Sequence, residues 1–182
     1  MLSVVRFFWH LRQARRRPPV GAWDTTRQSF RVRLRDLDAL RHMTNSAYLS
    51  VLDLARIELV VRSGAWAGQQ RSGIVAVVAN QTITYRKSLK WRDRFEIASR
   101  LAGVDDKAVY FEHQFTVQGE IYAQALGRVR FLRPGGGAVP ISEIMAMVDP
   151  ASSQPRELAP WIKDWAAATT LPSTREQVRS DW

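Results

Sequence analysis

The chain has 182 residues, of which 46% are apolar, carries a formal net charge of +10 and contains no cysteine. This length and apolar content suffice for one domain with a substantial core, which excludes a chain that is disordered throughout. The missing cysteine excludes disulfides, thiolate metal sites and a cysteine nucleophile, and it fits a reducing, cytoplasmic location.

Residues 1–20 join an apolar, aromatic start to an arginine cluster. The apolar part is too short to span a bilayer, which takes about 20 residues, and the charges follow it rather than precede it as in a signal peptide. Two interpretations stay open. Residues 1–17 could contact a membrane surface peripherally, with Phe7, Phe8 and Trp9 on one side of a short amphipathic helix, or they could pack against their own domain or a partner subunit. This tail holds half of the excess charge and no nucleic-acid-binding motif follows it, so we expect no nucleic-acid partner.

From Phe30 to Leu34 apolar side chains alternate with arginines, which predicts a half-buried strand. The polar loop Asp36–Thr44 follows, and after it a run to Ser63 has apolar residues around nearly the whole circumference of a helix. Good N-cap residues precede this run, and Gly64 stands where helices usually stop. We therefore predict a buried helix, wrapped by a sheet.

Beyond a connection at Gly68–Gly73, residues 74–85 are rich in Val, Ile and Thr and apolar on both faces at their start. This pattern predicts a strand in a central position of the sheet. Three further alternating segments, joined by turns at Asp105–Lys107 and Gln118–Glu120, predict an antiparallel meander.

The predicted organisation is a basic, aromatic N-terminal segment (1–27), a sheet-and-helix domain (28–134) and a C-terminal extension (135–182). In the extension we expect short helices at Ile141–Val148 and Trp161–Ala168, separated by a linker from Pro150 to Pro160. The fold class is α+β, with an antiparallel sheet around one long central helix.

The loop and the helix start read Asp36-Leu-Asp-Ala-Leu-Arg-His-Met-Thr-Asn-Ser-Ala-Tyr48, and Asp53-Leu-Ala-Arg56 follows on the helix. This pattern resembles hotdog-fold thioesterases, in particular the 4-hydroxybenzoyl-CoA thioesterase-like acyl-CoA thioesterases. Their loop reads roughly Asp-x-Asp-x-x-x-His-Val/Met-Asn-Asn-x-x-Tyr, before a helix with carboxylate-x-Ala-Arg. Residues 82–87 also look like the second strand of that family. The resemblance implies a hotdog fold, hydrolysis of an acyl-CoA or other acyl thioester to the free acid, no metal or organic cofactor, and a homodimer or higher homo-oligomer.

Two residues depart from the family pattern. Arg41 replaces the glycine that often precedes the histidine, and Thr44 replaces the first of the paired asparagines. The bulkier Arg41 either narrows the approach to the site or supplies a contact to the substrate phosphate.

Thioester hydrolysis needs a group that delivers water to the carbonyl carbon or attacks it, and a donor for the oxygen that becomes negative. The resemblance assigns the first role to Asp38, as general base or as nucleophile through a transient anhydride. For the second we expect backbone N–H groups near Asn45, because free amides and the helix dipole favour negative charge there. In a plainer interpretation, Asp38 only binds loop amides and the Asn45 side chain is a helix cap.

Other polar residues have both a functional and a structural interpretation. His42 either positions the substrate or is a structural hydrogen-bonding group, rather than the base. Asp53 is either an alternative catalytic carboxylate facing the partner subunit or an ion-pair partner of Arg56. Tyr48 belongs to the core or a pocket wall, and His113 is expected to be a satisfied core histidine.

The phosphates of CoA need basic contacts. The basic residues near the site either supply these contacts or are ordinary surface charges. The candidates for these contacts are Arg86, Lys87, Lys90 and Arg128. A different class of function also remains: a non-catalytic hotdog module that binds acyl chains or lipids or acts as a scaffold at a membrane. A hydratase is a weaker choice, because no separate Asp-x-x-x-x-His pattern occurs.

Overall fold

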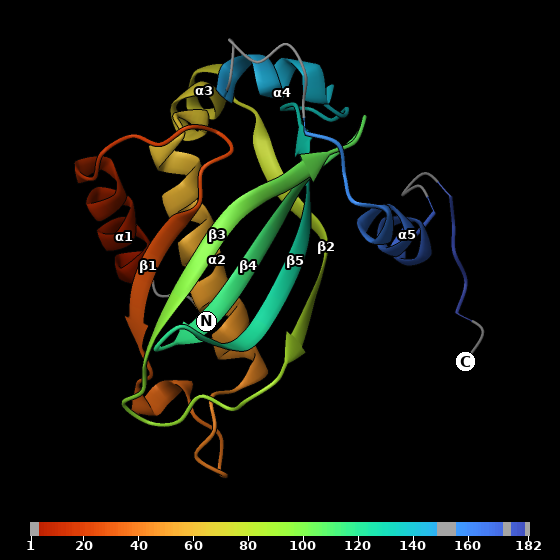
Figure 1. Ribbon diagram of the computed structural model, residues 1–182. Helices are drawn as coiled ribbons and strands as arrows, with labels where there is room; N and C mark the ends of the chain where they lie inside the picture. Colours follow the sequence, from red (N-terminus) through yellow and green to blue (C-terminus); the bar gives the residue numbers. More distant parts are fainter. Residues whose placement is uncertain (1–3, 149–155, 173–175, 181–182) are drawn as a thin grey trace.

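The computed structural model describes residues 4–148, 156–172 and 176–180. One antiparallel sheet with the strand order β1-β3-β4-β5-β2 forms its centre (Figure 1). The strands are β1 (Thr26–Arg31), β2 (Val75–Tyr85), β3 (Arg94–Val104), β4 (Val109–Val117) and β5 (Glu120–Leu132). The helices are α1 (Val4–Arg16), α2 (Asn45–Arg62), α3 (Ala65–Ser72), α4 (Ile141–Val148) and α5 (Pro160–Thr169), with a 3₁₀ turn at Leu34–Asp36.

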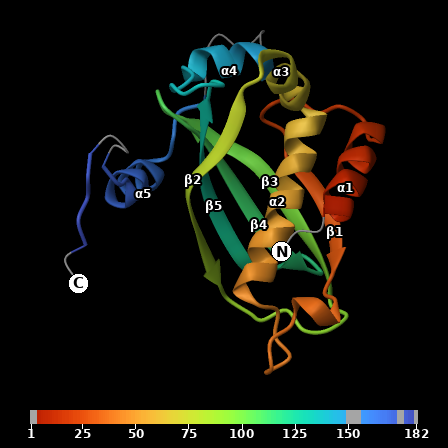
Figure 2. The same ribbon diagram turned by 180° about the vertical axis from the view of Figure 1, so that it is seen from behind.

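The long helix α2 lies along one face of the sheet, with α1 beside it and α3 and α4 at one end (Figure 2). Its buried residues, among them Val51, Leu54 and Leu59, pack against Phe95, Phe115 and other apolar side chains of the strands. The helix ends where predicted, because Gly64 adopts the left-handed conformation with a φ of 81°. The predicted α+β architecture, an antiparallel sheet around a buried helix, is confirmed.

The first strand differs from the prediction. It begins at Thr26 and ends at Arg31, while Leu34 falls in the 3₁₀ turn and is exposed. The inward positions of β1 are Thr26, Gln28 and Phe30, and two of these are polar, which hides the start of the alternation in the sequence. Gln28 is buried, and its amide nitrogen lies 2.9 Å from His10 Nδ1 on α1, which satisfies that nitrogen.

The central position predicted for β2 is wrong for the single chain, since β2 is an edge strand. Most of its residues are exposed on both faces, including Val75, Val77 and Val78. Its apolar residues therefore face solvent in one copy of the chain, although their pattern is that of a strand with neighbours on both sides.

A second correction concerns Gly68–Gly73, which was expected to be a connection. Most of it belongs to α3, whose ends are set by the left-handed residues Gly64 and Gly73. Ala65, Gly68 and Gln69 are buried on α3, and a Cβ at position 68 would lie in tight contact with Met147, 3.1 Å from its Cβ.

The two C-terminal helices confirm the prediction almost residue for residue. Helix α4 closes one end of the core with Ile141 and Ile144, whereas α5 packs Ile162 and Ala166 against the opposite face of the sheet. Of the predicted linker, residues 150–155 lie outside the described part of the chain. None of the helices in the described ranges is long and apolar enough to cross a membrane.

The N-terminal helix packs against its own domain. Leu11 and Ala14 are buried, and the buried carboxylate of Glu58 on α2 binds both Arg17 and Arg62. Glu58 and Arg62 stand one turn apart on α2, and Arg17 extends their ion pair to the segment that follows α1.

Candidate functional site

The loop between β1 and α2 folds back on itself at the N-terminal end of α2. Leu37 pairs with Met43 in a short bridge, and His42 pairs with Lys90 from the β2–β3 connection. Backbone hydrogen bonds from Met43 N to Leu89 O and from Thr44 N to Asp36 O, each 2.8 Å long, fix the loop to the strands and to the helix start.

Asp38 lies at the tip of this loop and is exposed. Its Oδ1 accepts hydrogen bonds from the amides of Leu40 at 2.8 Å and His42 at 2.9 Å. Within the described residues, its Oδ2 takes part in no hydrogen bond. The loop-binding interpretation of Asp38 is therefore observed, while one carboxylate oxygen stays available to a substrate or a water molecule. Its catalytic role stays a prediction.

Arg41 occupies the position where the resembling family often has glycine. Its φ is 63°, in the left-handed region, and its side chain points into solvent. A side chain at such an angle costs roughly 1 kcal/mol because Cβ crowds the following carbonyl oxygen. The loop thus keeps its turn without the glycine, at a cost in stability.

Next to the loop lies a shallow depression lined by His42, Lys87, Ser88, Lys90, Asp93 and Tyr122. His42 is half-buried in it. The ammonium group of Lys87 lies 5.6 Å from the centre of the Tyr122 ring. The predicted phosphate contact Lys87 and one edge of the predicted catalytic loop therefore meet, although Asp38 does not line the depression among the described residues.

Arg86 and Lys87 share one carboxylate. Each lies 2.7 Å from Glu120, and hydrogen bonds from Lys87 and then Arg86 lower the pKa of that carboxyl group. All three side chains are exposed, so an incoming phosphate competes with Glu120 at little cost.

The start of α2 is capped by Thr44, not by Asn45. Thr44 Oγ1 accepts a hydrogen bond from Ala47 N at 3.2 Å, and the Asn45 side chain is exposed. In the part of the chain that the structure describes, the amides of Asn45 and Ser46 donate to no acceptor. Two N–H groups with the positive end of the helix dipole behind them are therefore free, as expected for an oxyanion site.

Tyr48 belongs to the core. Its hydroxyl accepts a hydrogen bond from Leu89 N at 3.2 Å, and its ring packs against Tyr85 and Phe115. Burial raises the pKa of Tyr48 above its ordinary value, so the phenol stays neutral. Tyr48 thus supports the connection behind the loop.

Asp53 binds Arg56, as the structural interpretation predicted. Asp53 Oδ1 lies 2.9 Å from Arg56 Nη1, and the aspartate side chain is half exposed while that of Arg56 is buried. Because Asp53 comes eight residues after Asn45, it lies about 12 Å further along the helix axis. The structure therefore does not bring Asp53 to the loop of the same chain.

Asp53 and Arg56 line an apolar cavity of about 310 Å³ between α2 and the sheet, beneath α3 and α4. Apolar side chains from every strand except β1, together with α1, α2, α3 and α4, form most of its wall. They include Phe7, Ile57, Val60, Trp66, Val78, Phe111, Val129 and Met145.

His113 lies on the face of the sheet that covers α2. Its Nδ1 is 2.8 Å from Ser99 Oγ, but its Nε2 has no hydrogen-bond partner among the described residues. Burial and then the positive charge of Arg56 lower the pKa of His113 to about 3. It is a neutral core histidine, as predicted, but only one of its two nitrogens is satisfied.

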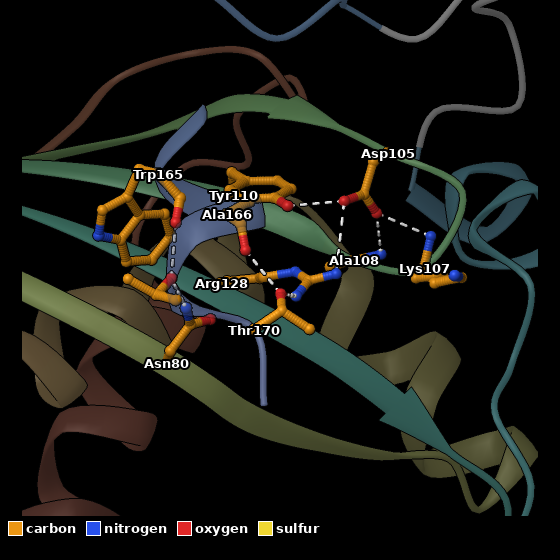
Figure 3. A network of polar contacts seen from close by, with 10 residues as sticks. Asn80, Asp105, Lys107, Ala108, Tyr110, Arg128, Trp165, Ala166 and Thr170 are labelled. Atoms are coloured by element: carbon orange, nitrogen blue, oxygen red, sulfur yellow. Dashed lines mark hydrogen bonds and ion pairs between the residues drawn. The ribbon is translucent and has the colours of Figure 1, made fainter. Parts of the chain in front are cut away.

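Arg128 is buried on the opposite face of the sheet, where it holds α5 (Figure 3). Its Nη1 donates to Thr170 Oγ1 at 2.8 Å, its Nη2 lies 3.6 Å from Asp105 Oδ2, and its guanidinium stands over the Tyr110 ring. This predicted phosphate contact is thus engaged by the protein itself.

Sequence reasoning missed the cavity. The Asp53-x-x-Arg56 spacing predicts an ion pair, but nothing in it indicates that apolar residues from four helices line the space next to it. Within the described ranges, no group of three or more His, Asp or Glu side chains is placed to hold a metal ion.

Comparison with known proteins identifies the family. A model of the thioesterase-like superfamily matches residues 32–166. The chain belongs to this superfamily. The match begins one residue after β1 and includes the loop, α2 and the whole meander.

Two relatives among curated proteins carry the same name. Protein THEM6 of Xenopus laevis is 36% identical over 129 residues, which cover 70% of this chain and 62% of the relative. Protein THEM6 of Danio rerio is 33% identical over 96 residues, covering 53% and 48%. This member of the superfamily therefore spans only part of the length of these relatives.

Solved thioesterases have the same fold. A thioesterase of Thermus thermophilus, solved with coenzyme A and zinc, is 28% identical with a TM-score of 0.59, covering 70% of this chain and 98% of its own. The probable thioesterase YbaW of Escherichia coli reaches a TM-score of 0.62 at 24% identity, covering 68% and 98%. The predicted hotdog fold is confirmed, and superfamily membership supports a thioesterase-like function.

Proposed function

We propose that the chain is an acyl-CoA thioesterase that hydrolyses an acyl thioester to the free acid and CoA. The observation that carries this proposal is the pair of free amides at the N-terminus of α2, Asn45 N and Ser46 N, next to the loop that bears Asp38. Free helix amides suit the oxygen that becomes negative when the thioester carbonyl is attacked. Membership of the superfamily agrees with this chemistry.

In this mechanism Asp38 uses its free oxygen. As a general base it removes a proton from a water molecule, whose oxygen adds to the carbonyl carbon while the Asn45 and Ser46 amides bind the carbonyl oxygen. As a nucleophile it attacks the carbon itself and forms an anhydride that water then hydrolyses. In both routes the carbon–sulfur bond breaks, the sulfur takes a proton, and the acid and CoA leave.

The test separates the charge of Asp38 from its role in the loop. Asp38→Asn keeps an oxygen that accepts the Leu40 and His42 amides, whereas Asp38→Ala removes it. We expect Asp38→Asn to lower kcat by about 100-fold or more, the usual contribution of a general base, with little change in thermal stability. An Asn variant that hydrolyses acyl-CoA within a few-fold of wild type, beside a destabilised Ala variant, would show that Asp38 is only a loop residue.

The two routes of Asp38 differ in where water oxygen ends up. In a single turnover in ¹⁸O-water, the anhydride route can leave ¹⁸O in the Asp38 carboxylate, and mass spectrometry of the loop peptide detects it. The general-base route places the label only in the released acid.

We also propose that two copies pair through β2, which would place the site at a subunit junction. The support is the long free edge of β2 with its exposed valines, which are 55%, 40% and 40% exposed at positions 75, 77 and 78. Unpaired apolar edges are rarely left open in native proteins. In sedimentation analysis we expect a dimer for wild type and a shift toward monomer for Val77→Lys, but not for Val178→Lys. A wild-type monomer at every concentration would contradict the pairing.

A non-catalytic acyl- or lipid-binding module is the second candidate. The observation that favours it is that Asp38 already binds two loop amides, while the apolar cavity lies away from the loop. Thermal stabilisation by acyl-CoA without turnover at any chain length would support this candidate over the thioesterase.

A further inference from the structure

The cavity beneath α3 and α4 combines an apolar wall with a single buried cation. Almost all of its lining is hydrocarbon, yet Arg56 enters it from α2 and is only 9% exposed. An apolar cavity that served only as a packing defect would hold no charged group, because burying a charge is costly.

The guanidinium of Arg56 is only partly satisfied. Its Nη1 donates to Asp53 Oδ1 at 2.9 Å, its Nη2 has a long contact of 3.4 Å to Gln81 Oε1, and its Nε has no partner among the described residues. Burial lowers the pKa of Arg56, and its one carboxylate partner is half exposed. The guanidinium edge formed by Nε and Nη2 is the edge that a carboxylate binds with two parallel hydrogen bonds.

The residues next to the Nε–Nη2 edge of Arg56 leave room for a ligand carboxylate. Gln81 is exposed on β2 in the single chain, so its amide can turn away from Arg56. A Cβ at position 127 would lie 3.5 Å from Arg56 Nη2, so glycine there lets the guanidinium pack close to the β5 backbone. A ligand carboxylate that replaces the Gln81 oxygen would therefore form two short charge-assisted hydrogen bonds in place of one long hydrogen bond.

We propose that this cavity is a fatty-acid site, in which Arg56 binds the carboxylate and the apolar wall takes the hydrocarbon chain. The volume of about 310 Å³ sets the size. A dry cavity of about 150 Å³ holds a benzene molecule with its six carbons, so this space takes up roughly twelve carbons of the hydrocarbon chain. This site is separate from the Asp38 loop and does not depend on hydrolysis, although its ligand belongs to the class of acid that the proposed reaction releases.

The first experiment titrates the purified chain of 182 residues with dodecanoate by calorimetry, with 1-dodecanol as a ligand of the same length and no charge. We expect one dodecanoate per chain, bound at least tenfold more tightly than dodecanol. Arg56→Met, which keeps the length of the side chain, should remove this preference. Equal affinities for the two ligands, unchanged in Arg56→Met, would overturn the role of Arg56.

The second experiment tests the cavity wall with two neighbouring residues of α2. Val60 lines the cavity and Val61 does not, and both are half-buried. Val60→Trp should lower dodecanoate affinity at least tenfold, whereas Val61→Trp should leave it within twofold. If the two variants bind dodecanoate alike, the ligand is not in this cavity. This comparison decides the question even if Arg56→Met fails to fold.

Asp53→Asn should raise the affinity for dodecanoate, whereas the changes at Arg56 and Val60 should lower it. Asp53 competes with the ligand for the guanidinium of Arg56, so removing its charge should tighten dodecanoate binding several-fold. Weaker binding in Asp53→Asn would contradict the proposed geometry. Because all these measurements are of binding, they hold whether or not Asp38 proves to be catalytic.

Discussion

The two ends of α2 differ in almost every physical respect. At the first turn, free backbone amides and an exposed loop carboxylate face solvent, and the loop bends through the left-handed residue Arg41. Two to three turns further on, the same helix presents the buried cation Arg56 to an apolar cavity. One helix thus combines a polar end suited to reaction chemistry with an apolar end suited to binding a hydrocarbon chain.

The two ends differ in how far apart in the sequence their residues lie. The polar end consists of residues within 13 positions of one another, from Asp36 to Tyr48, and their backbone amides do much of the work. The cavity end is assembled from distant segments, and each contributes only an apolar side chain. A short motif can therefore specify the first end, while only the folded chain defines the second.

We expect the largest loss of acyl-CoA hydrolysis when the carboxylate at the polar end of α2 is removed, and a smaller loss when the one at the cavity end is removed. If the chemistry belongs to the loop, Asp38→Asn lowers acyl-CoA hydrolysis by about 100-fold or more, and Asp53→Asn lowers it much less, because Asp53 lies about 12 Å away along the helix. Steady-state kinetics of the two variants, prepared side by side, measures the ratio. The reverse order of losses would move the catalytic carboxylate to the cavity end.

The next effect concerns the pH dependence of stability that comes from His113, the core histidine near the charge of Arg56. The pKa of His113 is lowered to about 3 in the fold, whereas it is about 6.5 in an unfolded chain. As the pH falls below about 6.5, the unfolded state takes up the proton first, so stability is full above this pH and is lost as the pH falls toward 3. This histidine alone should cost about 2 kcal/mol of unfolding free energy between pH 7 and 5.

Urea unfolding of wild type and His113→Gln across this pH range measures the contribution. The Gln side chain retains a group that can bond Ser99 but does not titrate, so its stability should fall less steeply. Parallel curves for the two proteins would mean that His113 is not held neutral by the fold.

A smaller effect sharpens the description of the loop end. Arg41→Gly should raise the unfolding free energy by about 1 kcal/mol, because glycine adopts a φ of 63° without a Cβ clash. Arg41→Ala, which keeps the clash, is the matched control and should show no gain. If both variants are equally stable, backbone strain at this position is negligible, and any change in KM for acyl-CoA then reports the side chain alone.

The smallest effect concerns the binding of α1, which lies beside the cavity end, to membrane vesicles. The inner face of α1 packs on α2, with Phe7 at the cavity, while Val5, Phe8 and Trp9 on its outer face are exposed beside arginines. We expect weak peripheral binding to vesicles that contain phosphatidylserine, reduced a few-fold in Phe8→Ser. Leu171→Ser, at another exposed apolar residue, should have no effect. If wild type binds neutral and anionic vesicles equally, the arginines of α1 do not contribute to membrane binding.

Prediction from the sequence succeeded for elements that a local pattern specifies. It failed for features that depend on contacts between distant segments. The buried helix, the meander and both C-terminal helices follow from periodicity and capping residues. The start of β1 was missed because Thr26 and Gln28 are polar yet buried, and α3 was missed because glycines at its ends resemble a loop. At the site, the loop, the Asp53–Arg56 pair and a cap among the residues that precede α2 were foreseen, but the cavity was not.

The open edge of β2 has a consequence for any measurement of stability on this protein. If its open edge is covered only by a second copy, part of the folding free energy comes from association and obeys mass action. Diluting the sample would then lower its melting temperature, and a melting temperature would characterise the chain only together with the concentration at which it was taken.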